Sequence, residues 1–216
     1  MSLKERFKEA KENKTFIVEK SYISELPVWD TVLKFIYDQT SEEDLEKENK
    51  KVFEQILPDL KIINTVHGNI VVQDPLWIKS LTGKAWEDIV ELKTFLYKLN
   101  KDFGIDSGFE NCSYYNGTVH RPCNCNSIWH SDGLVVSLAV KHISDHKDVF
   151  DAAYVQLIGK SFWKIDGDQN NIVVLNPGDL LLLPNELAHE VWGEGPRVGV
   201  LLNKKGTHKK PDTRIS

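Results

Sequence analysis

Two short segments in the second half of the chain carry residues that could bind a metal ion. His146-Lys147-Asp148 places an imidazole and a carboxylate two residues apart, so on a β-strand both side chains would leave the same face. His189 follows a turn sequence at 176–179 and the apolar run Leu180–Leu183. A turn, a buried strand and a second turn would bring this histidine beside His146. The spacing therefore predicts a metal site formed by His146, Asp148 and His189.

The composition of this ligand set favours one kind of metal. Two histidines and one carboxylate occupy one face of an octahedron and leave the remaining positions open. That arrangement suits Fe(II) when the ion must also bind oxygen and a second molecule, whereas structural zinc prefers a closed tetrahedral shell. The sequence therefore predicts Fe(II) at this site.

The elements that would position these residues change character near Gly104. Before Gly104, charged segments with apolar residues three and four apart predict helices, from Met1 to about Asn49 and again from about Trp86 to Leu99. After it, apolar runs broken by Gly, Pro and Asn predict the antiparallel strands 113–115, 134–140, 153–158, 162–165, 172–175, 180–183 and 198–202. We expect a helical extension at residues 1–104 packed on a mainly β core at residues 105–216, together one compact domain.

The stretch from His146 to Trp163 resembles the metal-binding strand of JmjC-type and cupin-like 2-oxoglutarate oxygenases. Those proteins carry His-x-Asp-x-x-Asp, then Gln, Gly and Trp, and here Gln156, Gly159 and Trp163 follow His146 by 10, 13 and 17 residues. The segment from Gly178 to His189 is similar to the second cupin signature, which is Gly, five residues, Pro, four residues and His. The resemblance covers about residues 112–203.

This resemblance implies a fold and a chemistry. The fold would be a double-stranded β-helix, also called a jelly roll. The cofactors would be Fe(II) and 2-oxoglutarate, and the usual outcome would be hydroxylation of a protein side chain or a small molecule. The alternatives are a cupin metalloenzyme that does not use 2-oxoglutarate, such as a dioxygenase or an isomerase, and a non-catalytic cupin-like binding module.

The chain departs from the family where a cation should hold the distal carboxylate of 2-oxoglutarate. The family commonly has Gly-x-Lys or Gly-x-Arg, whereas this chain has Gly159-Lys160-Ser161, so Lys160 should point away from the side where Ser161 points unless a bulge shifts the register. In other branches a basic residue lies roughly eight to eleven residues after the distal histidine. Arg197, eight residues after His189, is therefore the preferred anchor, with Ser161 and Tyr154 as hydrogen-bonding partners. An exposed Arg197 that only caps a turn, and Lys160 as the anchor, remain alternatives.

A second His-x-Asp pair competes for the metal. His130-Ser131-Asp132 could bind the ion together with His189, but it lies 29 residues before Gly159, compared with 13 for His146. Choosing it would require a long insertion inside the motif. The pair could otherwise line the substrate entrance.

A zinc site in the preceding segment is a further alternative. Cysteine and histidine side chains there could bind zinc, namely His120, Cys123, Cys125 and His130. Two cysteines separated by one residue do not have the usual zinc spacing, so buried cysteines in a loop are the expected arrangement.

Composition limits the partners that we expect. The 216 residues carry a net charge of -5, which gives no overall attraction to nucleic acid. No stretch approaches the roughly 20 apolar residues of a membrane helix, and residues 1–20 are charged throughout, unlike a secretory signal. Three cysteines suit a reducing compartment. We expect a cytoplasmic protein that acts on a small molecule or a protein side chain, with its oligomeric state open.

Overall fold

The computed structural model describes residues 1–32, 89–105, 129–137, 143–148, 150–166 and 172–204, together with short strands at 63–64, 70–71 and 77–79. The elements, in chain order, are α1 (Leu3–Glu12), β1 (Ile17–Glu19), β2 (Ile63–Asn64), β3 (Ile70–Val71), β4 (Trp77–Lys79), α5 (Val90–Asp102), β5 (Trp129–Ser137), β6 (Ile143–His146), β7 (Ala152–Ile158), β8 (Ser161–Ile165), β9 (Ile172–Leu175), β10 (Leu180–Leu183), β11 (His189–Trp192) and β12 (Arg197–Lys204). Neither described helix is long and apolar enough to cross a membrane.

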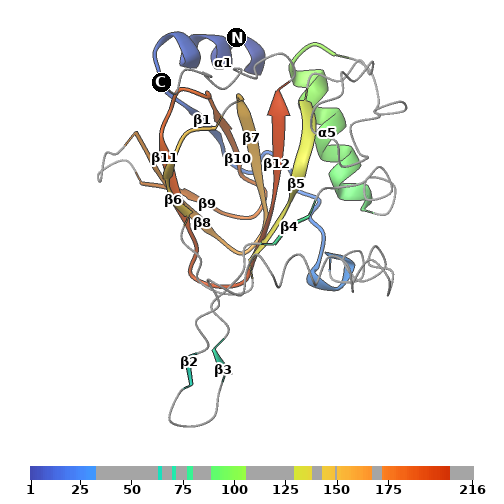
Figure 1. Ribbon diagram of the computed structural model, residues 1–216. Helices are drawn as coiled ribbons and strands as arrows, with labels where there is room; N and C mark the ends of the chain where they lie inside the picture. Colours follow the sequence, from blue (N-terminus) through green and yellow to red (C-terminus); the bar gives the residue numbers. More distant parts are fainter. Residues whose placement is uncertain are drawn as a thin grey trace, which may run out of the picture.

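Two antiparallel sheets face each other across the core (Figure 1). One has the strand order β1-β10-β7-β12-β5-β4 and the other has the order β6-β11-β8-β9. From β5 to β12 the chain crosses between the sheets, with β5, β7, β10 and β12 in the larger one and β6, β8, β9 and β11 in the smaller one. This alternation is that of a double-stranded β-helix, or jelly roll. The predicted mainly β fold is therefore confirmed.

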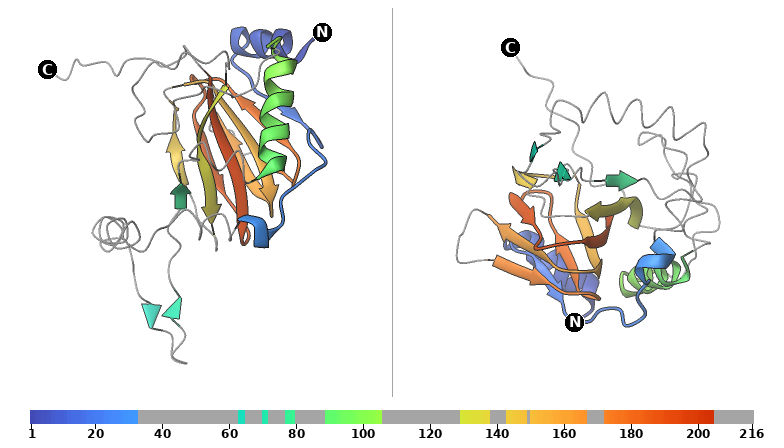
Figure 2. Two further views of the ribbon diagram at one scale, coloured as in Figure 1. Left: turned by 90° about the vertical axis from the view of Figure 1, so that its right-hand side faces the viewer. Right: turned by 90° about the horizontal axis from the view of Figure 1, so that it is seen from below.

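Alternation along the strands separates two buried clusters. In β7, Ala153, Val155 and Leu157 join a cluster with α1 and α5 on the outer face of the larger sheet, whereas Ala152 and Tyr154 belong to a second cluster between the sheets. The left view of Figure 2 shows α5 lying against that outer face. The space between the sheets is lined by the second cluster, whose buried members are Val135, Phe150, Ala152, Tyr154, Trp163, Ile165, Leu175, Leu181, Leu183, Leu187 and Val191.

The N-terminal region contributes strands as well as helices. Helix α1 begins with a capping box in which Ser2 and Glu5 bond each other's backbone N–H groups. The prediction of helix from Met1 to Asn49 is wrong at 17–19, because β1 pairs there with β10 and buries Ile17. At the opposite edge, β4 pairs with β5. The predicted helix near 86–99 is α5, and the predicted strand 113–115 lies outside the described residues.

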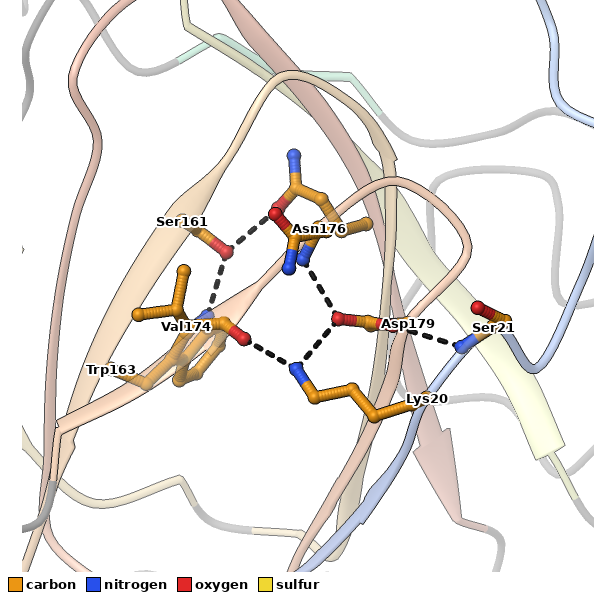
Figure 3. A network of polar contacts seen from close by, with 8 residues as sticks. Lys20, Ser21, Ser161, Trp163, Val174, Asn176 and Asp179 are labelled. Atoms are coloured by element: carbon orange, nitrogen blue, oxygen red, sulfur yellow. Dashed lines mark hydrogen bonds and ion pairs between the residues drawn. The ribbon is translucent and has the colours of Figure 1, made fainter.

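A polar clamp fixes the segment after β1 to the turn between β9 and β10 (Figure 3). The Asp179 carboxylate accepts hydrogen bonds from Lys20 Nζ at 2.8 Å and from the backbone N–H groups of Ser21 and Asn176, each at 2.9 Å. Burial would raise the pKa of Asp179, but these hydrogen bonds outweigh it and lower the pKa below the ordinary value. The clamp ties the N-terminal segment to the strand that leads toward His189.

Candidate metal centre

The structure brings His146, Asp148 and His189 together at the edge of the smaller sheet. Their ligand atoms all lie within 4.8 Å of one another. The Nε2 atom of His146 is 3.9 Å from Asp148 Oδ1, and that of His189 is 3.7 Å from Asp148 Oδ2. Two imidazoles and one carboxylate thus converge on a volume that could hold one metal ion.

Strand pairing explains how residues more than forty positions apart meet. His189 opens β11 and pairs directly with His146, the last residue of β6. The register shifts immediately afterwards, between His189 and Val191, and such irregularities re-aim side chains at the ends of strands. Asp148 follows β6 by two residues and reaches back to both rings.

The Nδ1 atom of His189 already has a hydrogen-bond partner. This atom lies 3.3 Å from the carbonyl oxygen of Leu187, which can only accept a hydrogen bond. The proton therefore belongs on Nδ1, and Nε2 presents its lone pair toward Asp148 and His146. Metal-binding histidines are commonly oriented by such a backbone carbonyl, so this donor set fits a bound metal ion.

Burial shifts the pKa values of two residues of this centre in ways that favour their uncharged forms. Burial lowers the pKa of His189 to about 4, helped by the neighbouring His146. Burial also raises the pKa of Asp148, and His146 opposes that shift. The side chains of His189, Asp148 and His146 are 3%, 18% and 39% exposed, respectively. His146 is therefore the most exposed of the three side chains, and His189 is the most buried.

A buried polar chain extends from this centre into the barrel. The Trp163 ring stacks on His189 with centroids 5.5 Å apart, and Trp163 Nε1 donates to Ser161 Oγ at 2.9 Å. The Ser161 hydroxyl donates to Gln156 Oε1 at 2.7 Å, and the Tyr154 hydroxyl lies 3.2 Å from the same oxygen. These hydrogen bonds join side chains of β7 and β8 into one buried network.

Arg197 is buried in the barrel, with an exposed fraction of only 1%. It opens β12, and a Cβ placed on Gly193 would collide with its guanidinium, so the side chain extends beneath the end of β11. Burial raises the pKa of Tyr154 to about 12, and the positive charge of Arg197 opposes that rise. The alternative in which Arg197 is an exposed turn cap does not hold, because the side chain is enclosed.

The remaining sequence candidates lie elsewhere. Lys160 is exposed on the turn after β7, so its ammonium group does not enter the barrel. His130 and Asp132 belong to β5 in the larger sheet, and their side chains lie outside the described residues. The zinc alternative at His120, Cys123 and Cys125 also lies outside them.

Comparisons with known proteins give partial matches to solved structures only. No protein-family model and no curated protein matches the chain. A cupin superfamily protein from Desulfitobacterium hafniense matches at 24% identity, over 35% of this chain and 70% of that one, with a TM-score of 0.29. YcfD, a ribosomal oxygenase from Escherichia coli solved with cobalt and 2-oxoglutarate, matches at 23% identity over 39% of this chain, with a TM-score of 0.31. The matched segment corresponds to only 25% of YcfD.

Sequence reasoning missed several contributors to the site. The Leu187 carbonyl is a backbone group, so no residue type could have revealed it. Gly193 and Gly199 carry a clearer signal, because each leaves room for a large interior side chain: a Cβ at Gly193 would meet Arg197, and a Cβ at Gly199 would meet the Tyr154 hydroxyl.

Proposed function

We propose that this protein is an Fe(II)- and 2-oxoglutarate-dependent oxygenase that hydroxylates a protein side chain or a small molecule. The observation that carries the proposal is the convergence of His146, Asp148 and His189 on a barrel that also buries Arg197. The ligand set is the two-histidine, one-carboxylate triad of non-haem iron oxygenases.

In this proposal each described residue has a defined role. His146, Asp148 and His189 hold the metal on one side and leave its other positions to exogenous ligands. Bound Fe(II) would supply the oxidation chemistry, with oxygen and 2-oxoglutarate as co-reactants. The Leu187 carbonyl keeps the His189 proton on Nδ1, and Trp163 supports the ring by stacking on it.

Arg197 supports the choice of a dicarboxylate co-reactant. Its guanidinium lies beneath Gly193 at one end of β11, whereas His189 stands at the other end. A metal and a cation separated in this way suit a ligand with an anionic group at each end. Inside the barrel a carboxylate without a cation would cost several kcal/mol, and the planar guanidinium can bind it through two parallel hydrogen bonds.

The test is the dissociation constant of 2-oxoglutarate, titrated without oxygen on the metal-loaded protein. Arg197→Ala should weaken binding at least roughly tenfold, about 1.4 kcal/mol. Lys160→Ala is the matched control, because it removes an exposed cation and should leave the constant unchanged. Release of succinate in the presence of oxygen would then establish turnover. Equal binding by the parent and Arg197→Ala would contradict the assignment of the anchor.

One observation favours a second candidate, a cupin metalloenzyme that does not use 2-oxoglutarate, such as a dioxygenase or an isomerase. Tyr154 and Ser161 both point their hydroxyls at Gln156 Oε1, so neither offers its hydrogen to a carboxylate without rearrangement. This candidate takes precedence if the parent binds the metal stoichiometrically and fails to bind 2-oxoglutarate in the titration above.

A further inference from the structure

The side chain of Gln156 lies at a defect in the pairing of β7 with β12. Val198 pairs with Ile158 and Gly199 pairs with Gln156, so Leu157 has no opposite residue and forms a bulge. Gln156 Nε2 donates to the carbonyl of Ile158 at 2.7 Å and to that of Val198 at 3.1 Å. The fully buried amide thus bridges the two strands at the bulge.

These two bonds fix which way the amide faces. A carbonyl oxygen can only accept, so the two carbonyls require the NH₂ group on their side. The amide oxygen must then face Ser161 and Tyr154, both of which donate to it. Since the Ser161 hydrogen is used in this way, Ser161 Oγ can accept the Trp163 Nε1–H bond. The donor and the acceptor of each hydrogen bond between Trp163 and the bulge are therefore fixed.

Both ends of this chain reach the residues of the proposed site. At one end, Trp163 stacks on His189 with an angle of 27° between the rings. At the other end, Val198 follows Arg197 directly in β12, so a bond to the Val198 carbonyl restrains the backbone that carries the guanidinium. The turn at Gly159 also packs against Pro196 and Arg197, and a Cβ there would collide with the Pro196 carbonyl.

We infer that Gln156 is a positioning residue that holds His189 through Ser161 and Trp163 and holds Arg197 through the bulge between β7 and β12. The His189 branch requires only that the site binds a metal, while the significance of the Arg197 branch for a co-reactant rests on the proposed function. The Gln156 amide uses Oε1 for the His189 branch and Nε2 for the Arg197 branch. Two different substitutions can therefore disrupt the two branches separately.

The experiment uses the full chain loaded with Co(II), whose visible absorption spectrum reports ligand geometry. Ser161→Ala removes the acceptor of Trp163 but leaves both Gln156 Nε2 bonds, whereas Gln156→Glu keeps an acceptor for Ser161 and loses the paired donor. Hydrogen exchange of the backbone amides of 197–199 reports the Arg197 branch without any need for 2-oxoglutarate. Ser2→Ala, which breaks the capping box of α1, is the control for loss of a remote hydroxyl.

The inference predicts opposite outcomes for the two variants. Ser161→Ala should shift the Co(II) spectrum and weaken Co(II) binding about three- to tenfold, with exchange at 197–199 unchanged. Gln156→Glu should keep the parent spectrum, exchange the amides of 197–199 at least tenfold faster and bind 2-oxoglutarate at least tenfold more weakly. A parent-like Co(II) spectrum in Ser161→Ala, or parent-like exchange in Gln156→Glu, would overturn it.

Failure of the proposed function is distinguishable from failure of this inference. If the parent binds Co(II) but not 2-oxoglutarate, the co-reactant is wrong, yet the spectrum and the exchange rates still test both branches. If Gln156→Glu does not fold, Gln156→Met, which retains the length of the side chain and removes all its hydrogen bonds, should both shift the spectrum and accelerate exchange. A Gln156→Met protein with neither change would overturn the inference as well.

Discussion

His146 and His189 pair directly across β6 and β11, and their ring centroids lie 4.3 Å apart. Two imidazoles this close would repel each other if both were protonated, and His146 contributes to the lowered pKa of His189. A cation placed between their Nε2 atoms and Asp148 would remove that repulsion and satisfy the carboxylate. The pairing of these two strands therefore creates a position that could hold a metal ion.

The first prediction is that metal binding depends on this trio. The protein should bind about one Fe(II) or Mn(II) per chain, and His189→Ala or Asp148→Ala should abolish binding, because each removes one of three ligands. Asp132→Ala is the matched control, since it removes the carboxylate of the competing His-x-Asp pair, and it should retain the metal. Elemental analysis after gel filtration measures all four proteins; metal loss in Asp132→Ala with retention in Asp148→Ala would show that the wrong strand was chosen.

The second prediction concerns the stability of the metal-free protein between pH 7 and pH 4. Burial lowers the pKa of His189 in the folded protein from its ordinary value of 6.5 to about 4, so in this range the unfolded chain takes up a proton that the folded chain does not. Stability should therefore fall as the pH falls from about 6.5 toward 4, with His189 accounting for roughly 3 kcal/mol of the change.

Urea unfolding at several pH values in the presence of a chelator measures this effect. His189→Leu removes the titrating group, so its stability should vary less with pH over the same range. The raised pKa of Asp148 acts with the opposite sign, because the folded state then binds the proton more readily than the unfolded chain. Asp148 is present in both proteins, so their difference isolates His189. A parallel pH dependence in the two proteins would contradict the lowered pKa.

Alternation of side chains explains why much of the fold could be predicted from the sequence. Strands β9 and β10 have the predicted bounds, 172–175 and 180–183, because short apolar runs between turn residues have few other solutions. The same alternation predicted that the side chains of Lys160 and Ser161 point to opposite sides. In the structure Lys160 is exposed and Ser161 is buried inside the barrel. Patterns that depend on one strand and its turns were therefore accessible.

Features that depend on partner strands could not be predicted from the sequence. Strand β1 carries too few residues, only 17–19, to show a pattern against its charged surroundings, and it is a strand because β10 offers an edge. The bulge at Leu157 likewise arises from the register between β7 and β12. Since that register directs Gln156 to the Val198 carbonyl, the sequence could identify Gln156 as a motif residue but not its hydrogen-bond partner.

The third prediction tests the space that Gly193 leaves for Arg197. Gly193→Ala should displace the buried guanidinium and, under the proposed function, weaken 2-oxoglutarate binding at least roughly tenfold, or 1.4 kcal/mol. Gly195→Ala is a close control, because a Cβ there meets nothing within 4 Å. Isothermal titration without oxygen compares both with the parent. Equal losses in the two variants would indicate an effect of the β11–β12 loop rather than of Arg197.

The last prediction concerns the attachment of α1 to the barrel. The fully buried carboxylate of Asp151 lies 2.8 Å from Lys11 Nζ in α1 and 3.9 Å from Lys204 Nζ in β12, and it accepts the backbone N–H of Asn185 at 3.2 Å. Asp151→Ala should therefore destabilise the fold by about 2–4 kcal/mol, because it leaves two ammonium groups close together and removes a buried acceptor.

Urea unfolding at pH 7 measures this change, with Glu12→Ala as the control. Glu12, the last residue of α1, forms an ion pair with Lys8 in the same helix, with 3.9 Å between Glu12 Oε1 and Lys8 Nζ. Both side chains of this pair are exposed. Its loss should cost less than about 0.5 kcal/mol, since water and salt screen such pairs. The two variants remove the same charge from the protein, so a similar loss in both would mean that overall charge, rather than the buried attachment at Asp151, sets the stability.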